Sequence, residues 1–151
     1  MRLLLVLAAV AAFAAAPAGF RFWKATEFQA LEKTLAGKVN PQKFANQQIG
    51  DFGTHSFMAV HRQGDGEAEI HLNQTDIFVV QSGAGVLVIG GEVVNGKTTA
   101  PNEIRGTAIR GGEKRPLAPG DIVNIPVKAP HQVLVEAGNR ITYTIVKVNA
   151  K

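Results

Sequence analysis

The sequence contains no cysteine. Structural disulfides, thiolate metal sites and a cysteine nucleophile are therefore excluded. After its first residues the chain also lacks a second long apolar run, an internal repeat and a low-complexity tract. Its 151 residues are 46% hydrophobic and 19% charged, which is an ordinary composition for a folded protein with one hydrophobic core. We therefore expect a single folded domain.

The first 18 residues differ from the rest of the chain. Arg2 supplies a positive start, residues 3–16 are an apolar run without a charge, and Ala16 and Ala18 form an A-x-A arrangement. This layout is typical of a secretory signal peptide. The run is shorter than the roughly 20 residues that a spanning helix needs, which disfavours a retained membrane anchor. We predict cleavage after Ala18 and a periplasmic or secreted protein that makes no membrane contact once the signal is removed.

Basic residues are in mild excess, with a formal net charge of +4. The basic residues nearest one another are Arg105, Arg110, Lys114 and Arg115. They are interleaved with glycine and proline and have no aromatic partners on which bases would stack. The pattern predicts a solvated loop and no nucleic-acid partner, with at most a preference for anionic ligands.

One helix is predicted over residues 26–36. Thr26 and Gln29 have the spacing of a capping box, and apolar residues follow at helical intervals. Residues 39–52 are polar and rich in turn formers, so they are interpreted as a connector. The helix and connector together make an N-terminal region over 19–52.

From residue 53 onward the pattern is typical of strands. Seven short segments are rich in Val, Ile and Thr and are bounded by turn residues. They are residues 56–62, 67–72, 77–81, 85–89, 121–125, 132–136 and 141–148. Seven or more short strands indicate a β-sandwich or β-barrel, so residues 53–151 are predicted to form one all-β domain.

Residues 94–119 form the longest stretch of weak pattern. They read as an excursion between two halves of the barrel, with room for one hairpin. Long loops in compact domains often carry function, so this segment is a candidate for the mouth of a substrate site. A dimer contact or a decorative insertion explains the same pattern equally well.

Histidine is scarce and its placement is informative. The chain has four: His55, His61, His71 and His131. Glu69 and His71 share one face of a predicted strand because strand side chains alternate, and a tight turn over 72–75 would bring Asp76 beside them. Imidazole and carboxylate groups on one barrel interior suit Mn, Fe, Ni or Zn. The alternative is a pair of hydrogen-bonded interior histidines, His71 and His131, in a barrel without metal.

These residues resemble the first cupin motif, which runs Gly, five residues, His-x-His, three or four residues, Glu, six residues, Gly. Glu69-x-His71, four residues, Asp76, six residues and Gly83 follow that spacing. Glu69 stands where the first His is usual, and Asp76 where Glu is usual. A second register pairs His71 with Asn73, but it leaves only two residues before Asp76 and fits the spacing less well.

The second cupin motif is also similar. Gly120, Pro126 and His131 match it in register, whereas Lys128 and Val135 depart from it. The likeness covers about residues 55 to 148, with both motifs in order. It implies a cupin-type jelly-roll β-barrel with a short N-terminal helix. It also implies a divalent metal ion held by Glu69, His71, Asp76 and His131.

Two functions remain open at this stage. The first is a metal-dependent enzyme that acts on a small polar molecule, as an oxygenase, isomerase, epimerase or lyase, with Glu69 as an alternative general base. The second is a barrel that binds a small ligand, with or without metal, and performs no chemistry. A titratable or hydrogen-bonding group near the metal that is not a ligand would separate them, and Glu69 and Gln132 are the candidates. Ser82 has no His–acid partner at a recognisable spacing, which disfavours a serine hydrolase. A homodimer through an edge strand or the helix would cover exposed strand edges.

Overall fold

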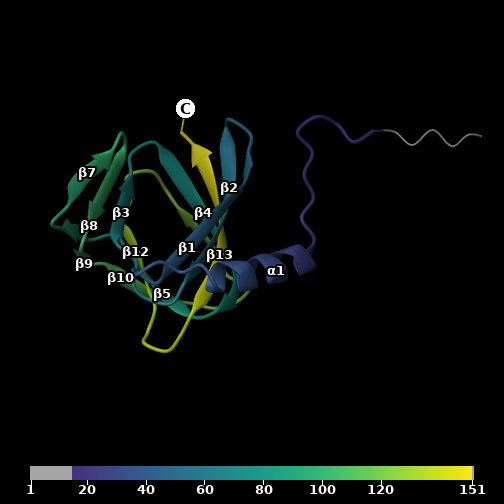
Figure 1. Cartoon of the computed structure of the whole chain (residues 1–151). Helices are drawn as coiled ribbons and strands as arrows, with labels where there is room; N and C mark the ends of the chain where they lie inside the picture. Colours follow the sequence, from purple (N-terminus) through teal and green to yellow (C-terminus); the bar gives the residue numbers. More distant parts are fainter. Residues whose placement is uncertain (1–14, 151) are drawn as a thin grey trace, which may run out of the picture.

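The computed structural model describes residues 15–150 (Figure 1). Most of the predicted signal peptide, residues 1–14, lies outside the described residues. Within residues 15–150, no helix is both long enough and apolar enough to span a membrane. The elements are α1 (Ala25–Ala36), β1 (Phe44–Asp51), β2 (His55–Arg62), β3 (Ala68–His71), β4 (Gln74–Gly83), β5 (Gly85–Ile89), β6 (Glu92–Val94), β7 (Lys97–Ala100), β8 (Glu103–Gly106), β9 (Ala108–Arg110), β10 (Glu113–Leu117), β11 (Ile122–Ile125), β12 (His131–Leu134) and β13 (Ile141–Asn149).

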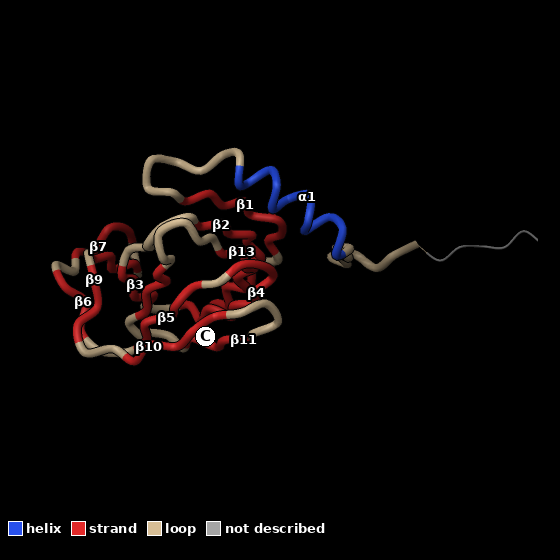
Figure 2. The backbone as a smooth tube through the Cα atoms, turned by 90° about the horizontal axis from the view of Figure 1, so that it is seen from below, coloured by secondary structure: helices blue, strands red, loops and turns tan. Residues whose placement is uncertain are grey.

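Two antiparallel sheets form the walls of the barrel (Figures 1 and 2). The first has strand order β1-β2-β13-β4-β11, and the second has order β10-β5-β12-β3-β8-β7. Strands β6 and β9 pair separately as a small ribbon. Strands that follow one another along the chain often lie in different sheets, as in a jelly roll. The predicted all-β jelly-roll class is confirmed, and each of the seven predicted strand segments overlaps a strand.

Aliphatic and aromatic side chains from both sheets fill the interior. The core residues are Val60, Phe78, Val80, Leu87, Leu117, Ile125, Val133, Val135, Ile141, Tyr143 and Ile145. The alternation of β13 shows how the sequence builds this core. Ile141, Tyr143 and Ile145 belong to the core, whereas Thr142 lies on the other face and bonds to His61. Strand periodicity therefore decides which residues of β13 reach the barrel interior.

Helix α1 lies against the outside of the first sheet, beside β1 and β2 (Figure 2). Its buried Leu35 packs with Ala45 of β1 and Ala59 of β2. The helix predicted over 26–36 is confirmed, but its capping differs from the prediction. The carboxylate of Glu27 accepts a hydrogen bond from the backbone N–H of Lys24 at 3.1 Å, so Lys24 is the N-cap instead of Thr26.

Two expectations about irregular segments are wrong. The predicted connector over 39–52 contains β1, which pairs with β2 along its whole length. Because β1 is an edge strand with several exposed residues, its sequence is polar and lacks a clean alternation. Residues 94–119 contain β7, β8, β9 and β10 instead of at most one hairpin, and β8 pairs with β3 beside the candidate ligands.

Gly83 permits the close approach of two chain segments where β4 ends. Its φ is +78°, and a Cβ added there would overlap the carbonyl oxygen of Arg140. We expect Gly83→Ala to lower the free energy of unfolding by about 3 kcal/mol or more. Gly138 is the control, because its φ is +85° and, apart from its two chain neighbours, no atom of residues 15–150 lies within 4 Å of an added Cβ. Gly138→Ala should cost only the backbone strain, about 1–2 kcal/mol. Chemical denaturation measures both, and equal losses would contradict the steric argument.

Candidate metal centre

The pairing of β-strands brings the candidate ligands together. Glu69 on β3 lies directly opposite His131 on β12 and, across its other edge, opposite Arg105 on β8. Residues directly opposite in an antiparallel pair project on the same side of the sheet with their Cβ atoms close together. By the same rule His71 on β3 faces Glu103 on β8. The register of three strands therefore builds one side of the site.

Glu69, His71 and His131 form a compact group of potential ligands. One donor atom from each lies within 4.8 Å of the others. Both imidazoles are almost completely buried, and the side chain of Glu69 is 16% exposed. The two rings lie close, with centroids 5.1 Å apart. Two imidazoles and a carboxylate in this arrangement match the donors that divalent transition metals prefer.

The imidazole of His71 is oriented by a carboxylate behind it. Its Nδ1 lies 2.7 Å from Oε1 of Glu103, a distance typical of a charge-assisted hydrogen bond. With Nδ1 donating to Glu103, Nε2 points to the carboxylates of Asp76 and Glu69, at 3.2 and 3.5 Å. A carboxylate that fixes the outer nitrogen of a histidine is the usual support for a metal ligand.

Among residues 15–150, one ring nitrogen of His131 has a hydrogen-bond partner and the other has none. Its Nδ1 donates to the carbonyl oxygen of Ala129 at 3.0 Å. Its Nε2 is the single buried side-chain nitrogen or oxygen among residues 15–150 that has no hydrogen-bond partner. The closest carboxylate oxygen, from Glu69, is 3.9 Å away. A buried polar atom without a partner is costly, so Nε2 of His131 is suited to accept an additional group.

Asp76 lies beside this group, but its carboxylate is already paired. The predicted turn does bring Asp76 close to His71. Lys147 on β13 lies directly opposite Asp76 on β4, and its Nζ is 2.9 and 3.0 Å from the two oxygens of Asp76. The same Nζ is 3.1 Å from Nε2 of His71. Asp76 therefore forms an ion pair with the ammonium of Lys147 and is not one of the three grouped donors.

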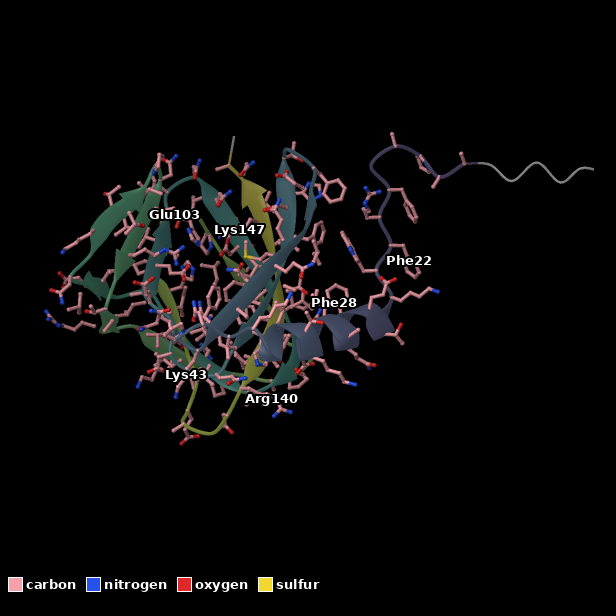
Figure 3. The ribbon with its side chains drawn as sticks, viewed as in Figure 1. Phe22, Phe28, Lys43, Glu103, Arg140 and Lys147 are labelled. Atoms are coloured by element: carbon pink, nitrogen blue, oxygen red, sulfur yellow. The ribbon has the colours of Figure 1, made fainter. Side chains whose placement is uncertain are left out.

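Glu69 and His131 lie at the wall of a cavity in the barrel. Glu103 and Lys147 both lie toward the end where the chain terminates, whereas Lys43 and Arg140 lie at the other end (Figure 3). A cavity of about 700 Å³ is lined by Glu69, His131 and Lys147 together with apolar side chains of the barrel wall. A small molecule in this cavity would therefore contact Glu69 and His131 directly.

Electrostatic contacts shift the pKa values of the group in different directions. Burial opposes the charge of Glu69, but hydrogen bonding to His71 and the charge of Arg105 outweigh it and lower the pKa of Glu69 to about 2. Burial also opposes a charged His71, but hydrogen bonds to Asp76 and Glu69 raise the pKa of His71 to about 9. Lys147 acts against this increase, because a second cation lies nearby. Burial lowers the pKa of His131, which stays neutral at pH 7.

His55 and His61 do not line the cavity, whereas Gln132 does. His61 is buried on the other face of β2, bonded to Thr142 at 2.8 Å, and His55 stacks on Phe52. Gln132 lines the cavity, but its amide nitrogen donates to the carbonyl oxygen of Gly66. These three residues are therefore not among the grouped donors.

Sequence reasoning missed Glu103, Arg105 and Lys147. Arg105 forms an ion pair with Glu69 and lies 3.1 Å from a carboxylate oxygen of Glu103. Both Glu103 and Arg105 belong to the weakly patterned segment, which gave no strand signal. Lys147 carried a usable signal, since it continues the inward alternation of Tyr143 and Ile145 on β13. A lysine at an inward strand position is unusual and needs a partner.

Comparison with known proteins identifies the fold. TT1209 from Thermus thermophilus is similar with a TM-score of 0.56 and 20% identity, over 79% of this chain and 94% of that one. A sugar phosphate isomerase from a cupin superfamily, from Silicibacter pomeroyi, has a TM-score of 0.52 and 19% identity, over 72% of this chain and 60% of that one. A cupin-2 domain from Rhodospirillum rubrum has a TM-score of 0.52 and 18% identity, over 73% and 62% respectively. The chain has the cupin fold, as its motifs predict.

Sequence comparison gives no further assignment. No protein-family model matches the chain, and no curated protein matches it. The fold alone does not assign a function, because one fold carries many activities.

Proposed function

We propose that this protein binds a divalent metal ion through Glu69, His71 and His131, and that it binds or acts on a small polar molecule in the adjoining cavity. The observation that carries the proposal is the unpartnered Nε2 of His131. It belongs to the same group as His71, whose outer nitrogen is held by Glu103. Three protein ligands with space for a further one are typical of catalytic metal sites, whereas structural sites are closed.

The cavity supports the second half of the proposal. Small-molecule sites are concave, mostly apolar and carry a few convergent polar groups. Here Glu69 and His131, two of the three grouped donors, line a cavity of about 700 Å³, which is large enough for a small organic molecule. A divalent ion held there would polarise an oxygen of the bound molecule as a Lewis acid.

Elemental analysis after metal loading tests the proposal. The purified protein is incubated separately with Mn²⁺, Fe²⁺, Ni²⁺ and Zn²⁺, desalted, and its metal content measured. We expect about one ion per chain for at least one of the four metals, because the three donors form one site for one ion. Absence of retained metal in all four cases would refute the metal site.

A barrel that binds its ligand without metal is the second candidate, and one observation favours it. The ammonium of Lys147 lies between Asp76 and His71, where it neutralises Asp76 without any ion. A protein that retains no metal but still binds a small molecule in the cavity would support this second candidate.

Metal affinity should depend on pH because metal and proton compete for His71. The pKa of His71 is about 9, so this imidazole is mostly protonated at neutral pH and must lose its proton to bind a metal. Glu69 is ionised and His131 neutral at that pH, so neither releases a proton. We expect the affinity to rise about tenfold per pH unit from about pH 6 to about pH 8 and to level off near pH 9.

Calorimetry measures this competition directly. Titrations at pH 7 in buffers of different ionisation enthalpy should show the release of about one proton per metal ion bound. A binding constant that does not change with pH, with no proton released, would contradict the assigned role of His71.

Export and self-association remain predictions. We propose that the N-terminal segment directs export and is cleaved after Ala18. N-terminal sequencing of protein from the exported fraction tests this, and a chain that still begins at Met1 would contradict it. The sheets leave β1, β11, β10 and β7 as edge strands, and a homodimer through one of them, or through α1, would be detected by light scattering.

A further inference from the structure

A second polar group in the cavity, separate from the candidate metal ligands, is the guanidinium of Arg62. Arg62 lies at the end of β2, is 9% exposed and lines the same cavity as Glu69 and His131. Its Nε donates a hydrogen bond to the hydroxyl of the buried Tyr143 at 3.0 Å. Its guanidinium carbon lies 4.4 Å from the centre of the Phe44 ring, which is a favourable cation–π distance.

The backbone leaves space for this guanidinium at Gly66. A Cβ added to Gly66 would lie 2.9 Å from Nη1 of Arg62, closer than a real side chain tolerates. Gly66 is fixed by two hydrogen bonds, from its N–H to Val133 and from the amide of Gln132 to its carbonyl oxygen. Tyr143, Phe44 and Gly66 together hold the guanidinium in one place, so little conformational entropy is lost when it binds a ligand.

The outer edge of the Arg62 guanidinium is free to bind. Among residues 15–150, Nη1 and Nη2 donate no hydrogen bond, and the closest carboxylate oxygen, from Glu69, is 3.7 Å from Nη2. Glu69 is itself held by Arg105. A guanidinium presents its N–H groups as a planar fork that matches the two oxygens of a carboxylate. The fork of Arg62 is therefore preorganised. Its one ion pair among residues 15–150 is the long contact with Glu69, which Arg105 shares, so its outer N–H groups are available to a second carboxylate.

We propose that Arg62 binds the carboxylate of a small organic acid whose apolar body lies in the cavity. The walls beside Arg62 are apolar, with Phe44, Met58, Val60 and Val133 among them. A carboxylate is favoured over a phosphate because Glu69 is close by and Asp65 and Glu67 also line the cavity, so a dianion would be repelled more strongly. The proposal rests on the proposed function in that it names the class of molecule bound in that cavity.

Matched pairs of acids and amides test this assignment. Benzoate and hexanoate, with benzamide and hexanamide as neutral counterparts, are titrated by ligand-observed NMR into protein freed of metal with a chelator. We expect at least one acid to bind and its amide to bind at least about tenfold more weakly, because only the acid completes a charge-assisted pair. Arg62→Gln should weaken binding of the acid by a similar factor, and Arg110→Gln, which removes an exposed cation outside the cavity, should leave it unchanged.

Gly66→Ala keeps the test decisive if Arg62→Gln does not fold. The added methyl group displaces the guanidinium but does not remove its charge from the protein. We therefore expect weaker acid binding with an unchanged far-UV circular dichroism spectrum. Four results would overturn the proposal: no binding of either acid, equal binding of acid and amide, tighter binding of phenyl phosphate than of benzoate, or unchanged acid binding in both variants. Metal titrations of the unchanged protein are measured separately. If that protein binds metal but neither acid, this inference alone is contradicted, and if it binds an acid but no metal, the metal site alone is contradicted.

Discussion

Replacing His71 and His131 together with alanine is expected to abolish metal binding. The double variant keeps only Glu69 of the three grouped donors, and a single carboxylate cannot hold a transition metal against water. Supporting residues around metal ligands are typically worth 10–100-fold in affinity, so loss of two ligands should exceed about 100-fold. Elemental analysis and calorimetric titration measure the loss.

A histidine of similar burial provides the control. His61 is completely buried, but it faces away from the cavity and bonds to Thr142. His61→Ala should reduce stability while the protein still binds metal, which separates ligand loss from a general effect of deleting a buried imidazole. Glu103→Gln should weaken metal binding by about 10–100-fold, because it removes the carboxylate that orients His71. Full metal affinity in the double variant would mean that the metal binds elsewhere.

Replacing Lys147 with methionine is expected to tighten metal binding. The ammonium lies 3.1 Å from Nε2 of His71, which is the nitrogen that would bind the metal. Its positive charge therefore repels a dication at that nitrogen. At an effective dielectric constant near 20, the repulsion between a dication and a unit charge about 4 Å away is about 8 kcal/mol, and movement of the lysine relieves part of it. We expect affinity to increase by more than about 100-fold, which corresponds to about 2.7 kcal/mol.

The same substitution should weaken the metal-free fold. Asp76 is 1% exposed, and without Lys147 its carboxylate keeps only His71 as a charged neighbour. Removing one partner of a buried pair costs about 3 kcal/mol or more, so thermal denaturation of the metal-free variant should occur at a lower temperature. Added metal should restore stability if Asp76 becomes a fourth ligand, and Asp76→Asn in the same background should cancel the gain in affinity.

Two further variants identify the cause of any change. Lys147→Arg retains the positive charge, so it should not tighten metal binding. Lys97→Met removes an exposed cation on β7, and its metal affinity should match that of the unchanged protein. If Lys147→Met binds metal no more tightly than the unchanged protein, the ammonium is not a competitor of the metal.

These experiments also decide between the two proposed functions. Metal retained by the unchanged protein supports a metal-dependent site with Lys147 as a neighbouring cation. Metal bound only by Lys147→Met would instead mean that the lysine has taken over the role of an ion in this barrel. In that case the proposed acid ligand of Arg62 would bind in a metal-free cavity that Lys147 and Arg105 also line.

Local pattern was sufficient for much of the fold. Alternation of Val, Ile and Thr predicted the interior strands, because one face of each is buried and the period of two is visible in the sequence. It failed for β1, whose edge position leaves it polar. It also failed for β7 to β10, which are short, and of which β7 and β10 are mostly exposed. Burial on one face is what makes a strand recognisable, and these strands have little of it.

The sequence by itself predicted the all-β class, a helix over 26–36 and four candidate ligands, of which Glu69, His71 and His131 lie grouped in the structure. Tertiary structure alone decided that Asp76 pairs with Lys147 and that Glu103 supports His71, because the register between distant strands fixes both pairs. It likewise placed Arg62 against Tyr143, which is 81 residues away in the chain. Register depends on the packing of the whole barrel, so no local window of sequence contains it.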